Sequence, residues 1–448
     1  MASSYQPEDS GLTADLLGAV ADSPALLAAV NQAIESRLSD LEILTHLRRQ
    51  WPAQLARAAL VMVQMSHRAL AGKFKLLRRR VPFFYAVPEA LEQATPLSAA
   101  LHKAATFARV APAGALVVDI GCGVGGDAIA LARAFPLLAV ELSPARSWMA
   151  HRNLHMLSLR HLVVQADFNQ LAMHLPSSTL LHADPARRTG GKRGSSQYFP
   201  GIECIASIAA TCSLAAIKVS PAADFAALPA APLELIAVDD HVVEATLWLG
   251  RGRDALRLQD RTATLIGDEF KWRLTGSAAS IQTVSDTVGP FVFETAGVVT
   301  RAGLAATLLK AVGLSPLSAD GCYATGPHVI EHPALRAFEV LNVGTFDMTR
   351  LRRILMGLPE DKPAAVRPQL EVKTRGGLGL NTDSLQRKLA PYVKQSAALI
   401  IYRSGRGVMA LVTRRVDTGR WTCDRWMDIN AVRRFTAEMG TMCAPENI

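Results

Sequence analysis

The sequence predicts an α/β protein with a central, doubly wound and mostly parallel sheet, preceded by a helical domain and followed by a smaller α/β domain. Between residues 115 and 265, short apolar runs alternate with helical stretches, as they do in such sheets. A glycine-rich turn links the first apolar run to a helical pattern, and a second alternating region occupies the C-terminal part. We therefore expect domains at residues 1–95, 96–330 and 331–448.

The composition sets limits on the class of protein. The 448 residues are enough for two or three domains, and with half of them apolar and 19% charged the chain is not largely disordered. No run of about 18 uncharged apolar residues occurs, so no membrane span is expected. The N-terminus lacks the layout of a signal peptide. The six cysteines show no C-x-x-C pair and no zinc spacing with histidine, so we expect no disulfide scaffold, no metal site and a cytoplasmic location.

Residues 11–80 have the apolar spacing of helices. Two apolar stripes are formed by Leu12, Leu16, Leu17 and Val20, and by Leu41, Ile43, Leu44 and Leu47. Trp51-Pro52 interrupts the pattern, which resumes over residues 53–70. The cluster Arg78-Arg79-Arg80 before Pro82 is either a solvated helix end or a patch that contacts RNA.

The central region contains six apolar runs that we expect to form the sheet. They span residues 115–120, 137–142, 161–166, 178–183, 214–219 and 234–238. Two further runs, Thr246–Leu249 and Thr262–Ile266, are expected to form a closing antiparallel hairpin. Residues 276–335 are harder to place and contain one expected helix, Arg301–Val312, among loops rich in Gly, Ser and Pro.

The C-terminal region repeats the alternation of strands and helices. Strands are expected at residues 338–343, 369–372, 397–402 and 408–413, and helices at residues 348–355 and 385–389. The whole chain carries a formal charge of +9. Residues 331–448 hold 19 Lys and Arg against 12 Asp and Glu, a charge of +7, so this region contributes most of the excess. A basic excess favours a polyanionic partner such as nucleic acid, although many soluble proteins are mildly basic.

The glycine-rich turn, Gly121-Cys122-Gly123-Val124-Gly125-Gly126, follows the first expected strand. Glycines are needed where the backbone turns tightly and approaches a nucleotide with no β-carbon in the way, so the unit is Rossmann-like. The turn satisfies both G-x-G-x-x-G and G-x-G-x-G, and a dinucleotide enzyme would show it too. Glu141, after the second strand, does not discriminate either, because a carboxylate there accepts hydrogen bonds from the ribose of any adenosine.

Two other carboxylates point to a particular cofactor. Asp119 precedes the first glycine, where a pyrophosphate would be repelled but the ammonium and sulfonium of S-adenosylmethionine would be attracted. Asp167 follows the third strand and is placed to accept a hydrogen bond from the adenine amino group, with Phe168 beside it to pack on the ring. Together with Gly121, Gly123, Gly125 and Glu141, these residues predict a site for S-adenosylmethionine.

The fourth strand ends in Asp184-Pro185-Ala186-Arg187, at the sheet edge where ligands of open α/β folds bind. This segment resembles the class I methyltransferases whose fourth motif is Asp-Pro-Pro followed by an aromatic residue. The resemblance implies that Asp184 and the Pro185 carbonyl hydrogen-bond a planar amino group and orient its lone pair toward the methyl group. Asp184 and Pro185 are therefore the candidate catalytic residues.

The segment departs from that motif at Ala186 and Arg187, where the second proline and the base-stacking aromatic ring are missing. Tyr198 or Phe199, just downstream, could supply the ring. Asp-Pro-Ala-Arg is also similar to the Asp-Pro-Pro-Arg of the uracil-5 RNA methyltransferases. Those enzymes need a cysteine after the fifth strand, where this chain has Lys218-Val219-Ser220-Pro221, so a covalent route is disfavoured.

A dense basic loop follows the candidate catalytic residues. It contains Arg187, Arg188, Lys192 and Arg193 among several glycines. Beside an active site these side chains would clamp the phosphates of an RNA substrate. Alternatively, the loop is an exposed segment whose charges only aid solubility.

Over nearly everything after residue 50, the chain resembles bacterial class I methyltransferases that end in a THUMP-like domain. The matching segments are Lys73-Phe74, residues 92–95, 117–126, 184–188, 243–248 and 301–303, and Glu371-Val372-Lys373-Thr374-Arg375-Gly376. THUMP domains are associated with RNA modification and are thought to deliver structured RNA, often tRNA, to a catalytic module. The resemblance implies that Lys373 and Arg375 face RNA; a turn with incidental charge is the alternative.

Three functions are compatible with these residues. The first is an S-adenosylmethionine-dependent methyltransferase that acts on a base of structured RNA, either tRNA or rRNA. The second is a methyltransferase for a small molecule or protein, with the C-terminal domain serving in assembly. The third is a non-catalytic RNA-binding protein that kept the fold, for which Ala186 and Arg187 are the best argument. The oligomeric state does not follow from the sequence.

Overall fold

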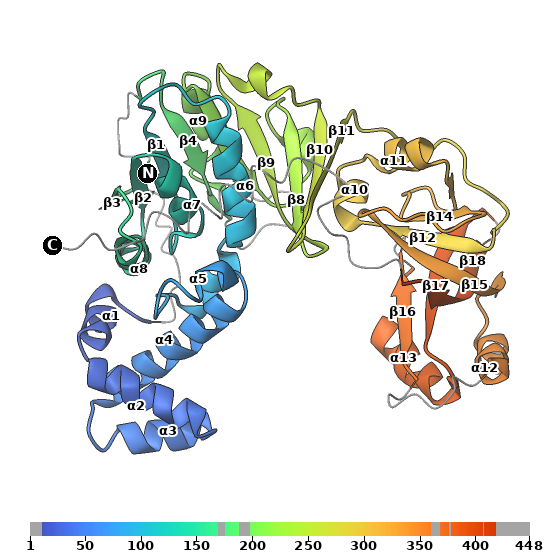
Figure 1. Ribbon diagram of the computed structural model, residues 1–448, viewed down its shortest axis with the longest axis horizontal. Coiled ribbons are helices and arrows are strands. Elements are labelled where there is room, and N and C mark those ends of the chain that lie inside the picture. Colours follow the sequence, from blue (N-terminus) through green and yellow to red (C-terminus); the bar gives the residue numbers. More distant parts are fainter. Residues whose placement is uncertain are drawn as a thin grey trace. The chain divides into compact units, whose positions relative to one another are not determined.

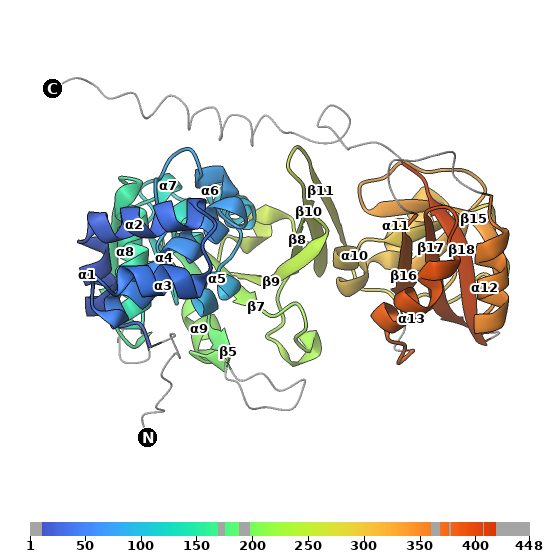
Figure 2. The same cartoon turned by 90° about the horizontal axis from the view of Figure 1, so that it is seen from below.

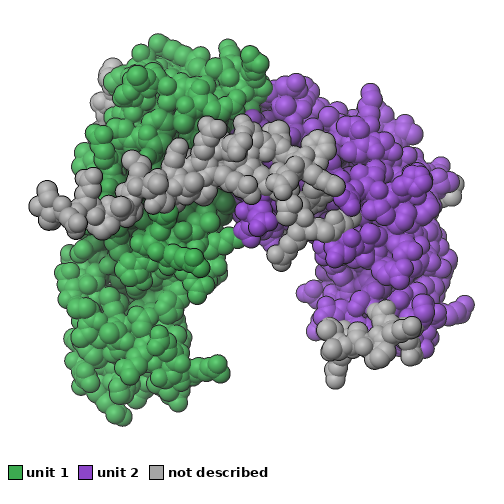
Figure 3. Space-filling view, viewed as in Figure 1, with its two compact units in different colours: residues 1–233, 243–258 green, residues 234–242, 259–448 purple. Residues whose placement is uncertain are grey.

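The computed structural model describes residues 11–168, 175–187, 198–359, 368–375, 378–405 and 407–417. The chain forms two compact units, which Figure 3 colours separately. Unit 1 comprises residues 1–233 and 243–258, and unit 2 comprises residues 234–242 and 259–448. This division differs from the domains expected from the sequence, because the N-terminal helices belong to the same unit as the central parallel strands.

Four helices form the N-terminal part of unit 1 (Figures 1 and 2). They are α1 (Ala14–Ala21), α2 (Pro24–Glu35), α3 (Asp40–Leu47) and α4 (Ala53–Ala71). Local chemistry sets their starts: the Thr13 hydroxyl caps α1, Ser39 and Glu42 form a capping box on α3, and Pro52 precedes α4. The apolar face of α4 packs against the other three helices, and their hydrophobic core is continuous with that of the sheet.

Two helices and a parallel sheet follow. The elements are α5 (Pro88–Gln93), α6 (Leu97–Ala108), β1 (Val117–Ile120), α7 (Gly126–Ala134), β2 (Leu137–Glu141), α8 (Pro144–Met156), β3 (His161–Gln165), β4 (Leu180–Ala183), α9 (Ile202–Ala209) and β7 (Leu214–Val219). The strands lie in the order β3-β2-β1-β4-β7, all parallel. The five strands expected here are confirmed, with ends that differ by at most two residues.

The same sheet continues through β9 (His241–Leu249), β8 (Leu233–Val238), β10 (Arg261–Ile266) and β11 (Lys271–Gly276), in that order after β7. β9 is antiparallel to β7. The hairpin expected between residues 246–249 and 262–266 is wrong, because β8 lies between β9 and β10 and β10 pairs with β11. The turn after β8 is Asp239-Asp240, both with positive φ, a hairpin conformation that Asn-Gly would have signalled more clearly.

Unit 2 contains a seven-stranded sheet in the order β13-β14-β12-β15-β18-β17-β16. The strands are β12 (Phe291–Thr295), β13 (Ser315–Pro316), β14 (Tyr323–Gly326), β15 (Leu335–Thr345), β16 (Leu370–Thr374), β17 (Ala397–Ser404) and β18 (Gly407–Arg415). Only β16 and β17 pair in parallel among the registers determined. The boundary expected at residue 330 falls inside this sheet, because β12 and β14 pair on one side of β15.

Both faces of β17 are buried, which explains its continuous apolar sequence. Ile400 and Tyr402 join a cluster with Phe338, whereas Leu399 and Ile401 join a cluster covered by two helices. These helices are α12 (Met348–Gly357) and α13 (Thr382–Leu389). Two further helices in the described part of the unit are α10 (Gly297–Arg301) and α11 (Ala305–Val312). They replace the single helix expected at residues 301–312, because Gly303, with φ +74°, ends the first.

Two negative findings concern only the described part of the chain. No single helix in it is long and apolar enough to span a membrane, although the pair α1 and α2, bent by 81°, meets that test jointly on length and composition. The four cysteines within the described residues are free.

The division into units predicts how fragments will behave. A fragment of residues 331–448 lacks β12 and β14 and would expose Phe338, so we expect it to show no cooperative thermal unfolding. A fragment of residues 259–448 keeps the whole seven-stranded sheet and should unfold cooperatively, as followed by circular dichroism. Equal cooperative transitions in the two fragments would contradict this division.

Candidate functional site

The glycine turn joins β1 to α7 in the conformation that its sequence predicts. Gly121, Gly123 and Gly125 have φ values of +73°, +57° and +91°, in the region that favours glycine. A β-carbon on Gly121 would lie 2.6 Å from the carbonyl oxygen of Asp184. The glycine turn and the segment that follows β4 are therefore in close backbone contact, and only glycine allows it.

Glu141 lies at the end of β2 and holds this turn. Its Oε2 accepts a hydrogen bond from the backbone N–H of Gly123 at 2.8 Å, and its Oε1 accepts one from Ser143 at 2.9 Å. Carboxylate oxygens can each accept a second hydrogen bond, so binding of ribose hydroxyls stays a compatible prediction. A β-carbon on Gly123 would meet no atom within 4 Å, so space is open beside the turn.

Asp119, on β1, is fully buried beneath the turn. His182, on β4, shares a hydrogen bond of 2.7 Å between its Nδ1 and the Asp119 Oδ1. The other oxygen, Oδ2, has no hydrogen-bond partner among the described residues. Burial raises the pKa of Asp119 despite the nearby imidazole. Burial alone would lower the pKa of His182, but the carboxylates of Asp127 and Asp119 outweigh it and raise that pKa.

Lys103, on α6, is the centre of a buried network of charged side chains. Its ammonium lies 2.8 Å from the carboxylate of Asp127 on α7 and 2.7 Å from that of Glu244 on β9. It also lies 3.4 Å from His182 Nε2. Thr95 donates a 3.3 Å hydrogen bond to Glu244, which extends the network to the segment before α6. Burial opposes the charge of Lys103, but the two carboxylates raise its pKa.

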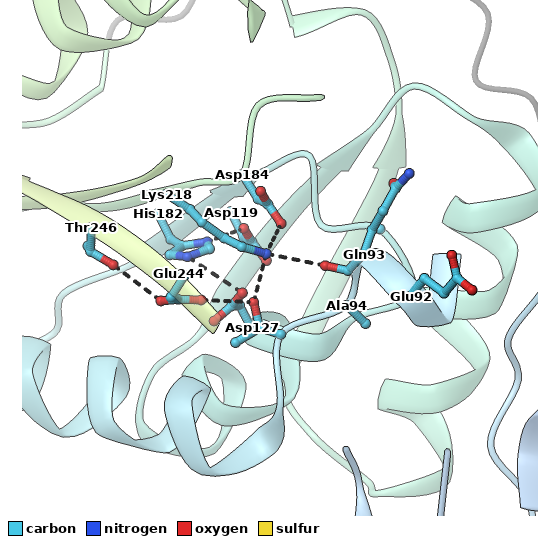
Figure 4. Close-up of polar contacts among 12 residues, drawn as sticks. Glu92, Gln93, Ala94, Asp119, Asp127, His182, Asp184, Lys218, Glu244 and Thr246 are labelled. Carbon is cyan, nitrogen blue, oxygen red and sulfur yellow. Dashed lines mark hydrogen bonds and ion pairs between the residues drawn. The ribbon is translucent and has the colours of Figure 1, made fainter. Parts of the chain in front are cut away.

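The candidate catalytic residue Asp184 is part of a second ion pair (Figure 4). Lys218, on β7, donates to Asp184 Oδ2 at 2.7 Å, to Thr95 Oγ1 at 3.0 Å and to the Gln93 carbonyl at 3.3 Å. The Asp184 side chain is 32% exposed, whereas that of Lys218 is 13% exposed. Through Thr95, polar contacts run without a break from Asp119 under the glycine turn to Asp184 at the sheet edge.

Lys73 holds the segment that supplies Gln93 and Thr95. Its ammonium donates to the carbonyls of Leu91, Glu92 and Ala94 at 3.0, 2.5 and 2.7 Å, at the C-terminal end of α5. Burial, followed by the charge of Lys218, lowers the pKa of Lys73 to about 8. The segment 92–95, noted in the sequence, is thus fixed between a helix end and the second ion pair.

The other candidate residues of unit 1 follow β3 and β4 or lie in β6 (Tyr198–Phe199). Phe168 is buried and Asp167 half-buried after β3, so their contacts with adenine stay a prediction. Pro185 is buried beside Asp184. The Tyr198 hydroxyl accepts a 3.0 Å hydrogen bond from the Ser220 backbone, which ties β6 to the end of β7.

The basic loop is described only at its start. Arg187 lies in β5 (Ala186–Arg187), which pairs antiparallel with β6 and places Arg187 opposite Tyr198. Arg188, Lys192 and Arg193 lie outside the described residues.

Lys373 and Arg375 belong to unit 2. Lys373 lies 3.0 Å from Glu294 and 2.8 Å from Glu371, and only 12% of its side chain is exposed. Arg375 is 47% exposed and lies 3.9 Å from Glu294. Both roles in RNA binding stay predictions, and Arg375 has the more accessible cation of the two.

Sequence reasoning missed most of the buried network. Its unrecognised members are Thr95, Lys103, Asp127, His182, Lys218 and Glu244. Lys103 stands in an alanine-rich helix, and Glu244 stands in the segment Val-Val-Glu-Ala-Thr-Leu-Trp, so charge inside apolar elements was the available signal. Within the described residues, no group of three or more His, Cys, Asp or Glu side chains is placed to hold a metal ion.

The chain is similar along most of its length to proteins that are named as methyltransferases. It is 29% identical over 373 residues to an uncharacterized S-adenosylmethionine-dependent methyltransferase from two strains of Mycobacterium tuberculosis, covering 79% of this chain and 95% of those relatives. The crystal structure of a putative methyltransferase from Porphyromonas gingivalis matches with a TM-score of 0.65 and 18% identity, over 88% of this chain and 98% of the other. No protein-family model matches.

Sequence similarity and fold therefore agree with the enzyme class expected from the motifs. The curated relatives are named as S-adenosylmethionine-dependent methyltransferases, and the chain shares its fold with a putative methyltransferase. The residues by which this chain would hold S-adenosylmethionine remain those predicted from the sequence.

Replacement of Gly121 by alanine tests the close approach of the two backbones. We expect Gly121→Ala to weaken S-adenosylmethionine binding at least tenfold, about 1.4 kcal/mol, because the Asp184 carbonyl must move. Gly114→Ala is the matched control, since Gly114 also has positive φ but meets no atom within 4 Å. It should lose about 1–2 kcal/mol of stability and keep its affinity. Calorimetry and denaturant unfolding measure both, and equal affinities in the two variants would contradict the prediction.

Removal of the Lys103 ammonium tests the buried network. Lys103→Met would leave the carboxylates of Asp127 and Glu244 buried without their cation, so we expect a loss of about 3–5 kcal/mol in the free energy of unfolding. Lys310→Met, at an exposed position of α11, should change it by less than about 0.5 kcal/mol. Urea titration followed by tryptophan fluorescence gives both values. A small loss at Lys103 would show that the two carboxylates find other partners.

Proposed function

We propose that this enzyme transfers the methyl group of S-adenosylmethionine to a base in structured RNA, tRNA or rRNA, with Asp184 and Pro185 positioning the target. The observation that carries the proposal is the backbone contact between Gly121 and Asp184. It brings the glycine turn and the candidate catalytic segment side by side, as a direct transfer between two bound molecules requires.

The residues around the glycine turn fit the cofactor. The open space beside Gly123 is where a β-carbon would obstruct the ligand, and Glu141 borders it from the end of β2. Asp167 and Phe168 would hold the adenine. Asp119 is fully buried, so we propose that it acts on the cofactor's ammonium through its charge rather than through a direct contact. When bound, the cofactor would supply a methyl group on a cationic sulfur: the target nitrogen would gain the methyl group and lose its proton to solvent, and the sulfur would leave as a neutral thioether.

We propose that hydrogen-bond acceptors of the protein hold the target base. Lys218 occupies Asp184 Oδ2, and among the described residues no partner is found for Oδ1. This oxygen and the Pro185 carbonyl can accept hydrogen bonds from a planar N–H group and direct its lone pair toward the methyl group. Tyr198, whose hydroxyl is tied to Ser220, is the candidate ring for stacking on the target base.

Charge supports RNA as the substrate class. The chain carries a formal charge of +9, and residues 331–448 contribute +7 of it. We propose that the C-terminal part is a THUMP-like RNA-binding module in which Arg375 contributes to the basic surface, beside the more buried Lys373. Arg187 and Arg188 would contact phosphates near the target. A small-molecule or protein substrate is the competing proposal, and the next experiment separates the two.

Replacement of Asp184 by asparagine tests both the residue and the substrate class. An extract of cells lacking the gene is incubated with the pure enzyme and methyl-labelled S-adenosylmethionine, then separated into RNA, protein and small molecules. We expect label in RNA, and about 100-fold slower labelling with Asp184→Asn at unchanged cofactor affinity. Asp254→Asn, with a side chain that is 94% exposed, is the control and should label at the normal rate. Label confined to another fraction would overturn the RNA assignment.

A further inference from the structure

Lys218 has no role in the functions considered from the sequence, yet it reaches the candidate catalytic carboxylate. An ammonium has three N–H donors. All three have acceptors here: the Asp184 carboxylate, the Thr95 hydroxyl and the Gln93 carbonyl. The partners come from the segment after β4, the last residue of α5 and the segment between α5 and α6, whereas Lys218 itself lies on β7. Lys218 thus joins three parts of unit 1 at the site.

This geometry determines what Asp184 can do. Oδ2 is bound by Lys218 at 2.7 Å, which fixes the rotation of the carboxylate and leaves Oδ1 as the oxygen that can face a target. A carboxylate held against an ammonium accepts hydrogen bonds but does not donate them. The ammonium is held in turn by Thr95, whose hydroxyl is anchored by Glu244 in the buried network.

We propose that Lys218 is a positioning residue for methyl transfer: it fixes the direction and charge of Asp184, so that the site selects a target group that carries a hydrogen. The inference rests on the proposed role of Asp184 and extends it to a residue that does not touch the target. Lys218 has no N–H left for a substrate. Loss of its side chain should therefore slow turnover and leave cofactor binding intact.

The pKa of Lys218 depends on its pairing with Asp184. Burial alone would lower the pKa of Lys218, but the carboxylates of Asp184, Glu244 and Asp127 outweigh it and raise that pKa. The other facing groups are Thr95 and Gln93, and the cations Lys103 and Lys73 act against the charge. Removal of the Asp184 charge should therefore let Lys218 lose its proton at lower pH.

The experiment uses the full chain and combines kinetics with NMR. Labelling rates are measured with the extract fraction that accepts the methyl group. We expect Lys218→Met to lower kcat about 100-fold, with KM for S-adenosylmethionine within about twofold of the normal value. Lys218→Arg keeps the charge and should recover part of the rate, whereas Lys218→Gln, which keeps hydrogen bonding alone, should not. Lys310→Met is the matched control and should have the same kcat and KM as the unchanged enzyme.

Two further results separate positioning from a purely structural role. When Lys218→Met is added to Asp184→Asn, kcat should fall little further, because the two residues act as a unit. In chains labelled with ¹³C at lysine Cε, the Lys218 signal, assigned by its absence in Lys218→Met, should titrate at lower pH in Asp184→Asn. If Lys218→Met fails to fold, Lys218→Gln serves in both measurements.

Each outcome decides something. A normal kcat in Lys218→Met would overturn the proposal. So would a Lys218 signal that titrates at the same pH with and without Asp184→Asn. Additive losses in the double variant would also overturn it, since the residues would then act separately. Label in protein or small molecules would end the RNA assignment while leaving Lys218 testable with that fraction. No label in any fraction would overturn both proposals together.

Discussion

The ion pairs of Lys103 with Asp127 and Glu244 are the constraint on which the site depends. These charges are nearly or fully buried, and removing any one would leave a partner without compensation in a low-dielectric interior. The three residues come from α6, α7 and β9, so the network fixes how these elements meet. The helix that follows the glycine turn is thereby held in place by charge as well as by apolar packing.

From this buried network, polar contacts extend to the candidate site residues Asp119 and Asp184. His182 connects Lys103 to Asp119 under the glycine turn, while Glu244 and Thr95 connect it to Lys218. The glycine turn, where we propose that the cofactor binds, and Asp184, which we propose positions the target, are therefore joined by one set of contacts. Because these contacts are buried, small movements at one end are resisted by close packing rather than absorbed by solvent.

The parts of this structure that the sequence predicts are those with local causes. The parallel strands follow from apolar runs between helices, and the glycine turn follows from positions that need positive φ. The buried network joins residues as far apart in the sequence as Thr95 and Glu244, which are separated by 149 positions, so no local pattern reveals it. The hairpin around Asp239-Asp240 was missed for a different reason: aspartates can adopt positive φ but do not require it.

The charges of the site also bear on the choice of cofactor. The Asp184 carboxylate is paired with the Lys218 ammonium, and the Asp119 carboxylate is hydrogen-bonded to the imidazole of His182. Lys103 faces two carboxylates, so this group of three side chains has one more carboxylate than ammonium. Glu141 places a further carboxylate at the end of β2. A pyrophosphate would be repelled by these charges, whereas a sulfonium and an ammonium would be stabilised by them. The network that holds the helices in place thus also favours a cationic, phosphate-free nucleoside over a dinucleotide.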